Sequence, residues 1–297
     1  MYYLLGLEKN LSTIFLLCQG KSKLEITSQA ELKQAYLEFL KIIQPKVWRP
    51  DVKDNVFLYD PELIADLIVN YLDEGILTDF SAEIRVSKLP SMHAALREMQ
   101  SALDHIYFQD KHHHDLLRFT INTLFYAESY QQGGGSVSSA IGVIWCANRK
   151  NWTLNDSVEF LVHELTHNLV FLDELRYQHY VSLCEIAKQE NFAVSAVLKK
   201  PRPLDKVFHS LIVAVEILSL RLSWLGEPAQ SPKVHPPTWE LYLNCCTTLS
   251  SVKQNIAQKG LVTSRFIELL ALIEAKLNKM EELFTTKNCL DAITVVV

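Results

Sequence analysis

Two histidines and a glutamate stand close together in the segment His163-Glu164-Leu165-Thr166-His167. On a helix, residues four apart lie on one face about one turn apart, so both imidazoles can reach a single metal ion. The glutamate beside the first histidine points in an adjacent direction, from which it can act on a water molecule at the metal. The chemistry of this chain therefore depends on whether the segment is a metal site and on which metal it binds.

Two histidines do not complete a metal shell, so a third protein ligand is expected. The residues after His167 do not continue into a Gly-x-x-His extension, and the next candidates are Asp173, Glu174, His179, His209 and Glu216. His209 and Glu216 are seven apart on one expected helix, about 10 Å along its axis, so they are not expected to bind the same ion. His209 has few polar neighbours in the sequence, which favours it as a ligand because a buried polar group needs a partner. Glu216 would instead give the His-His-Glu set of many metallopeptidases, and the spacing leaves both open.

A second histidine cluster, His112-His113-His114, is flanked by Asp110, Lys111 and Asp115. Consecutive residues do not share a helix face. We therefore predict a solvated loop here rather than a ligand set.

The metal-binding segment falls in an expected helix from about residue 155 to 176, preceded by the capping-box pattern Thr153-Leu154-Asn155-Asp156. Apolar spacing and proline positions predict further helices over 29–44, 61–72, from Pro90 onward, 206–225, 237–257 and 263–286, with Asp205 as a cap. The segments 119–130 and 137–147 are rich in β-branched and aromatic residues, which predicts two strands in a hairpin. The glycine-rich stretch 131–136 between them would be its loop, or an active-site flap.

These elements predict a mainly α fold with a small β-sheet, an α+β class in which a zincin-like strand precedes the metal-binding helix. The organisation we expect is a helical N-terminal region (1–115), a metal-site region (116–230) and C-terminal helices (231–297), or one compact domain. In the 116–230 region the strand pair, the HExxH helix and the apolar helix that carries His209 would come together.

Composition limits the classes of partner. The chain has 297 residues, 48% hydrophobic and 21% charged, with a net charge of −5. This is the composition of a globular protein, and it offers no basic field for nucleic acid or for a membrane surface. No signal peptide and no run of about 18 uncharged apolar residues is recognised, and none of the six cysteines forms a C-x-x-C pair. We expect a cytoplasmic protein with reduced thiols and no nucleic-acid or membrane partner.

The segment from Ser138 to Arg221 resembles a bacterial family of HExxH-motif peptide modification proteins. The resemblance is carried by the stretches IGVIWCAN and EFLVHELTHNLVFLDEL, the element Tyr180-Val181-Ser182, and KKPRPLDKVFHSLIVAVEI. It covers somewhat over a quarter of the chain. The joint occurrence of the HExxH helix and the Arg-Pro-Leu segment that leads to His209 is what makes it specific.

The resemblance implies iron(II)- and 2-oxoglutarate-dependent β-hydroxylation of side chains in a ribosomally made precursor peptide. It implies His163, His167 and His209 as iron ligands, with Glu164 orienting groups in the site without acting as a base. The far carboxylate of 2-oxoglutarate needs a cationic partner, for which Arg202 is the first candidate and Lys200 and Arg176 follow.

The residues by themselves favour a different reaction. A zinc peptidase would use Glu164 as the general base, with a peptide substrate added to the strand near 137–147. A third interpretation is a binding or structural domain whose metal site has been lost.

Overall fold

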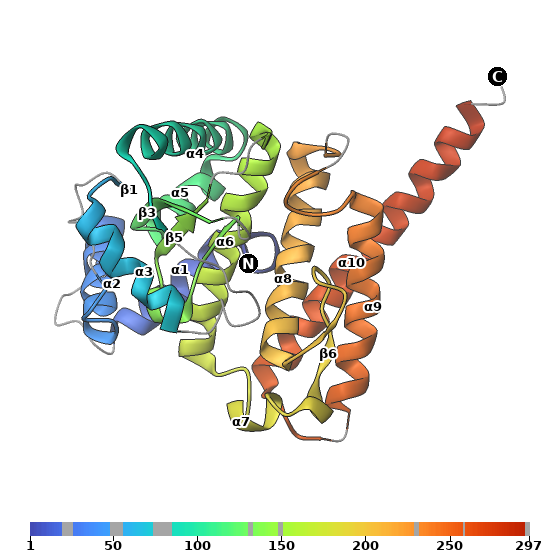
Figure 1. Ribbon diagram of the computed structural model, residues 1–297. Helices are drawn as coiled ribbons and strands as arrows, with labels where there is room; N and C mark the ends of the chain where they lie inside the picture. The colour runs from blue at the N-terminus through green and yellow to red at the C-terminus, as the bar shows by residue number, and fades with distance from the viewer. Residues whose placement is uncertain are drawn as a thin grey trace. The chain divides into compact units, whose positions relative to one another are not determined.

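The computed structural model describes residues 1–19, 26–47, 56–73, 85–129, 133–147, 151–228, 232–257 and 259–294 (Figure 1). The fold is mainly helical with a small mixed sheet, as the sequence predicts. The chain divides into two compact units, Met1–Arg176 with Pro228–Val234, and Tyr177–Glu227 with His235–Val297. The main division therefore falls inside the region 116–230 that was expected to carry the metal site.

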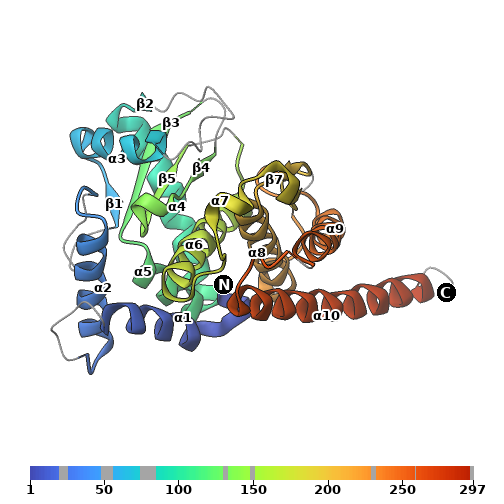
Figure 2. The same ribbon diagram turned by 90° about the horizontal axis from the view of Figure 1, so that it is seen from below.

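Six of the helices begin in the first unit. They are α1 (Tyr2–Gln19), α2 (Gln29–Ile43), α3 (Pro61–Asp73), α4 (Leu89–Gln109), α5 (Lys111–Thr120) and α6 (Leu154–Tyr177). The helices expected over 29–44, 61–72, from Pro90 and over 155–176 are confirmed, whereas α1 and α5 were not predicted. Figure 2 shows α1 beside α2 and α5, and an apolar cluster that includes Ile14, Tyr36 and Phe119 fills the space between these helices.

The sheet of the first unit has the strand order β1-β3-β5-β4, with β2 paired to β3. Its strands are β1 (Phe57–Leu58), β2 (Arg85–Val86), β3 (Thr123–Glu128), β4 (Gly134–Gly135) and β5 (Val143–Cys146). The predicted hairpin is wrong, because β3 and β5 pair in parallel. The antiparallel partner of β5 is β4, which the glycine run itself forms, and the chain reverses between them at η1 (Ser138–Ala140) and Gly142. Tyr130 of the expected strand and Gln131 and Gln132 of the expected loop lie outside the described residues.

Helices α3 and α4 cover opposite faces of this sheet. The ring of Tyr71 on α3 makes edge contacts with Phe125 and Trp145, which are register partners in β3 and β5. Successive strand residues point to opposite faces, so Cys146 faces the other side. There it adjoins Ala95 of α4. Both faces are buried, which explains why β5 reads as a continuous apolar run.

The second unit is built on three long helices, α8 (Leu204–Leu220), α9 (Thr238–Ile256) and α10 (Ser264–Thr294), which pack side by side (Figure 1). Before them come α7 (Leu183–Ile186), η2 (Gln189–Asn191), β6 (Ala193–Val194) and β7 (Pro201–Arg202), and one π-helical turn, η3 (Arg221–Leu225), follows α8. Phe208 of α8 and Phe266 of α10 stack with ring centroids 3.8 Å apart. The predicted helices are confirmed, but Asp205 does not cap α8: Pro203 occupies the cap position, without a side-chain hydrogen bond.

Candidate functional site

The histidine pair of the HExxH segment lies on α6. This helix begins with the capping box that the sequence predicts. The Asp156 carboxylate accepts hydrogen bonds from the backbone N–H and hydroxyl of Thr153, and the Thr153 hydroxyl accepts one from the backbone N–H of Asp156. His167 lies one helical turn after His163, and the Nε2 atoms of the two rings are 3.1 Å apart. The His163 side chain is 21% exposed, so it is partly accessible to solvent.

The separation of the two Nε2 atoms fits a shared metal ion. Two nitrogens that each bind a metal at about 2.0–2.1 Å, at about 90–109° to each other, lie about 2.8–3.4 Å apart. The observed 3.1 Å lies within this range. The same separation suits a hydrogen bond between two neutral rings, one of which donates its Nε2 proton to the other. The pair thus supplies two nitrogen donors with the geometry of metal ligands.

Glu164 is buried beside this pair. The residue is 4% exposed, and its Oε1 lies 3.9 Å from Nε2 of His163. Burial raises the pKa of this carboxyl to about 8, and a hydrogen bond from Ser136 opposes the rise. The second oxygen, Oε2, is buried and has no hydrogen-bond partner among the described residues. A carboxyl held in this way beside a potential metal ligand is the second chemical group of the site.

Ser136 and Asn168 are linked to Glu164 by hydrogen bonds, and the sequence did not single out either of them. The side-chain amide of Asn168 donates to Oγ of Ser136 at 2.9 Å and to the backbone carbonyl of Glu164 at 2.8 Å. Its Oδ1 accepts from the backbone N–H of Gly142 at 2.6 Å. One signal was available for Asn168, which stands four residues after Glu164 and so shares its helix face. Ser136 had no such signal, because it reaches Glu164 only through the pairing of β4 with β5.

The other candidate ligands are distributed over both units. Asp173 and Glu174 lie further along α6 in the first unit, and Asp173 is 1% exposed. His179, His209 and Glu216 belong to the second unit and are buried. Within the ranges that the structure describes, no group of three or more His, Cys, Asp or Glu side chains could hold a metal ion. Among the described residues, the candidate metal-binding group is therefore the pair His163 and His167.

The cationic candidates for binding a cosubstrate carboxylate also lie in different elements. Arg202 ends the short strand β7, whose backbone pairs with β6, and its side chain is partly exposed. Lys200 immediately precedes this strand, and Arg176 lies in the last turn of α6. Arg202 and Lys200 belong to the second unit, whereas Arg176 belongs to the first.

The histidine cluster at 112–114 is not the solvated loop that we predicted. All three residues lie on α5, and His113 is completely buried, with its ring stacked on Tyr2 at 4.3 Å and in edge contact with Tyr3 at 5.3 Å. Asp110 caps this helix by accepting from the backbone N–H of His113. One turn of helix carries the three histidines to different faces, so one of them enters the core while His112 stays exposed.

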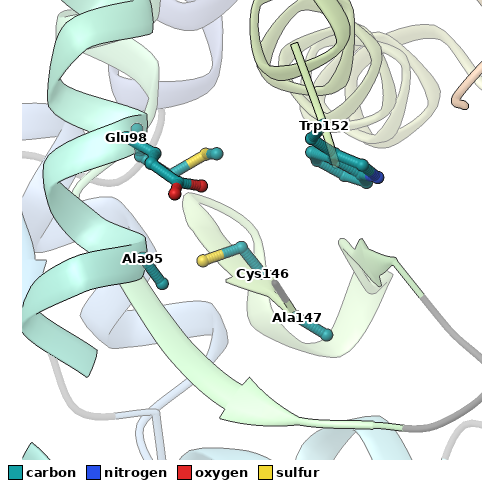
Figure 3. Close-up of a pocket in the computed structure, with 6 residues that line it drawn as sticks. Ala95, Glu98, Cys146, Ala147 and Trp152 are labelled. Carbon is teal, nitrogen blue, oxygen red and sulfur yellow. The ribbon is translucent and has the colours of Figure 1, made fainter. Parts of the chain in front are cut away.

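A small pocket lies elsewhere in the first unit, between α4 and the end of β5 (Figure 3). It is lined by Ala95, Glu98, Met99, Cys146, Ala147 and Trp152. Burial raises the pKa of the Cys146 thiol, whose Sγ donates to the backbone carbonyl of Phe125 at 3.3 Å. None of the lining residues belongs to the HExxH segment, and a protonated, hydrogen-bonded thiol is a poor nucleophile.

One helical stretch in the described chain, Leu204–Leu225, is long and apolar enough to cross a membrane, with a mean hydropathy of 1.5 over its most apolar window. However, 78% of that window is buried in the structure. The core helix of a globular protein passes the same test of length and composition, so this stretch is weak evidence for a membrane span.

Comparison with known proteins adds no family to this description. No protein-family model matches the chain, and no curated protein matches it significantly. The resemblance to HExxH-motif peptide modification proteins therefore rests on the residues quoted above, and the site is interpreted from its own geometry.

Proposed function

We propose that this chain is a metal-dependent enzyme that hydroxylates side chains of a peptide at the β-carbon, using iron(II) and 2-oxoglutarate. The observation that carries metal dependence is the pair of Nε2 atoms of His163 and His167, 3.1 Å apart on a partly exposed face of α6. The choice of hydroxylation is supported by the resemblance, through the joint occurrence of this helix and the segment from Arg202 to His209.

Each residue of the proposed site has a distinct task. His163 and His167 would hold iron(II), with His209 as the third ligand that the resemblance implies, and nitrogen donors of this kind suit ferrous iron. Arg202 would bind the far carboxylate of 2-oxoglutarate through its planar guanidinium. When bound, iron and 2-oxoglutarate supply the oxygen chemistry, in which 2-oxoglutarate, O2 and a C–H group become succinate, CO2 and a C–OH group. Glu164 would orient the site, because it is buried and held by Ser136.

One specific observation favours a second candidate, a zinc peptidase. The Oε1 atom of Glu164 lies 3.9 Å from Nε2 of His163, so a carboxyl stands next to the metal-binding nitrogens, where a general base is needed. In that reaction Glu164 would take a proton from the attacking water and give it to the departing amine. The two candidates use the same histidines and differ in what Glu164 does.

The first test separates the two reactions. The protein is purified without oxygen and given iron(II), 2-oxoglutarate and a mixture of synthetic peptides, and succinate and peptide masses are measured. Hydroxylation predicts succinate together with a peptide mass gain of one oxygen atom, both dependent on 2-oxoglutarate. Cleaved peptides in the absence of 2-oxoglutarate would establish the peptidase instead. Glu164→Gln should abolish cleavage, whereas a hydroxylase should retain activity.

The second test concerns the metal itself. Cobalt(II) is titrated into the protein and into the variants His163→Ala, His167→Ala and His209→Ala, and bound metal is followed by visible absorption. Loss of any ligand should weaken binding by at least about tenfold, because each bond to the metal is removed outright. The matched control is His112→Ala on the exposed face of α5, which should bind like the original protein. Full affinity in His209→Ala would refute the third-ligand assignment, and no binding by the original protein would leave the interpretation as a binding or structural domain.

A further inference from the structure

We propose that Ser136 and Asn168 are positioning residues that hold the carboxyl of Glu164 beside the histidine pair. This inference rests on the proposed function, and it applies to both candidate reactions because each requires Glu164 in a fixed place. Its basis is a chain of hydrogen bonds within the first unit that joins the segment after β4 to α6.

Asn168 is the most firmly held residue in this series of hydrogen bonds. It has no exposed surface, and its side-chain amide uses both N–H groups and its carbonyl oxygen, toward Ser136, Glu164 and Gly142 respectively. A backbone N–H can only donate, so the bond from Gly142 identifies Oδ1 and leaves Nδ2 to face Ser136. The amide therefore has one satisfactory orientation, and it ties the start of β5 to α6.

Ser136 links Asn168 to the carboxyl of Glu164. Its hydroxyl accepts from Nδ2 of Asn168, which directs the single hydroxyl proton toward the carboxyl of Glu164. Ser136 is 6% exposed, so water does not compete for this bond. One carboxyl oxygen is held by the hydroxyl, while Oε2 is buried and has no hydrogen-bond partner among the residues described.

The backbone of β4 fixes the place of Ser136. Gly134 has a φ of +137°, and a Cβ atom there would come within 2.6 Å of the Phe160 ring on α6 and would also contact the backbone oxygen of Trp145. The strand β4 therefore packs directly against α6. This packing places Ser136, which directly follows the strand, beside Glu164. The glycine run, which the sequence offered as a loop or a flap, is a structural support of the site.

The experiment compares Ser136→Ala with the conservative variant Ser136→Thr, which keeps a hydroxyl, and with Ser138→Ala as the matched control. Ser138 lies in the same segment and is exposed, and its backbone carbonyl, which accepts from Gln44, survives the substitution. Asn168→Asp is a second variant that keeps the acceptor for Gly142 but cannot donate to Ser136. Turnover and peptide KM are measured in whichever reaction the protein performs, together with cobalt(II) affinity.

We expect Ser136→Ala and Asn168→Asp to lower kcat by roughly ten- to a hundredfold, the range for groups that orient site residues from behind. The peptide KM and the cobalt(II) affinity should stay within about twofold, because neither residue contacts the peptide or the metal. Ser136→Thr should recover most of the loss in kcat, and Ser138→Ala should show none. An unchanged kcat in Ser136→Ala, or an equal loss in Ser138→Ala, would overturn the inference.

A readout without turnover separates this inference from the proposed function. The infrared difference spectrum between the protein and Glu164→Gln isolates the carboxyl band of Glu164. That band should shift in Ser136→Ala and stay in place in Ser138→Ala. If no reaction is found with any peptide, the proposed function fails while a shifted band still supports the positioning role. An unshifted band in Ser136→Ala refutes that role.

Discussion

The buried histidine of α5 should make this protein less stable in mild acid. His113 is completely buried between Tyr2 and Tyr3, and neither ring nitrogen has a hydrogen-bond partner within the described part of the chain. Burial lowers its pKa to about 3, with a smaller contribution from the N-terminal amine. Asp110, the nearby acid, already accepts from the Tyr2 hydroxyl and from the backbone N–H of His113. The variant His113→Phe keeps a planar ring but removes the titration.

The expected magnitude follows from the two pKa values. In the unfolded chain the histidine takes up a proton as the pH falls through 6.5, whereas in the folded protein it stays neutral down to about 3. Stability is therefore lost between these two values as the pH falls. Each pH unit below 6.5 removes about 1.4 kcal/mol, so the free energy of unfolding should drop by about 2 kcal/mol at pH 5 and about 3 kcal/mol at pH 4.

The assay is urea unfolding at pH 8, 7, 6 and 5 for the original protein, His113→Phe and the control His112→Phe. His112 is the exposed neighbour on the same helix, so its replacement should leave the pH dependence unchanged. The original protein and the control should lose about 2 kcal/mol more than His113→Phe between pH 8 and pH 5. Parallel losses in all three proteins would show that His113 is solvated or hydrogen-bonded, and would refute the reasoning.

Two further predictions concern the supports of α6. Gly134→Ala should lower the free energy of unfolding by at least about 2 kcal/mol, because a Cβ atom would meet Phe160 and the backbone is in a glycine conformation, while the neighbouring Gly135→Ala, with open space, should lose less than half as much. Equal losses in urea unfolding would show that the strand moves away from the helix at little cost. Thr153→Ala should remove about 1 kcal/mol through loss of the N-terminal cap, and Thr153→Ser should retain it. A serine variant as unstable as the alanine variant would mean that the methyl group, rather than the cap, stabilises this end.

Apart from α1 and α5, the long helices were predictable because their signals are local. Thr153 and Asp156 form the reciprocal cap that their spacing indicates, and α6 covers the segment expected for the HExxH motif. Asp205 was wrongly expected to cap α8, since Pro203 holds the cap position and no side chain bonds there. A cap residue is recognised by type, but the exact start of the helix is set by the chain that precedes it.

Strand pairing was less predictable because it is not a local property. The β3 and β5 segments were recognised as strands, yet their order along the chain suggested a hairpin that the structure replaces by a parallel pair. Two consecutive strands separated by a glycine run satisfy the signals for a hairpin. The signals do not reveal that Gly134 and Gly135 themselves add a strand, since two residues without side chains show no strand pattern.

The HExxH segment predicts the histidine pair, because its two histidines are four residues apart. The burial and hydrogen bonding of Glu164, in contrast, depend on residues elsewhere in the chain. Its carboxyl is buried by the fold and is held by Ser136, which arrives through the pairing of β4 with β5. Glutamine at position 164 would keep the size of the side chain and an oxygen to accept from Ser136, while losing the capacity to take up a proton. A loss of activity in Glu164→Gln would therefore report proton transfer, whereas a loss in Ser136→Ala would report position. The two variants together separate the two roles that a motif alone assigns to one residue.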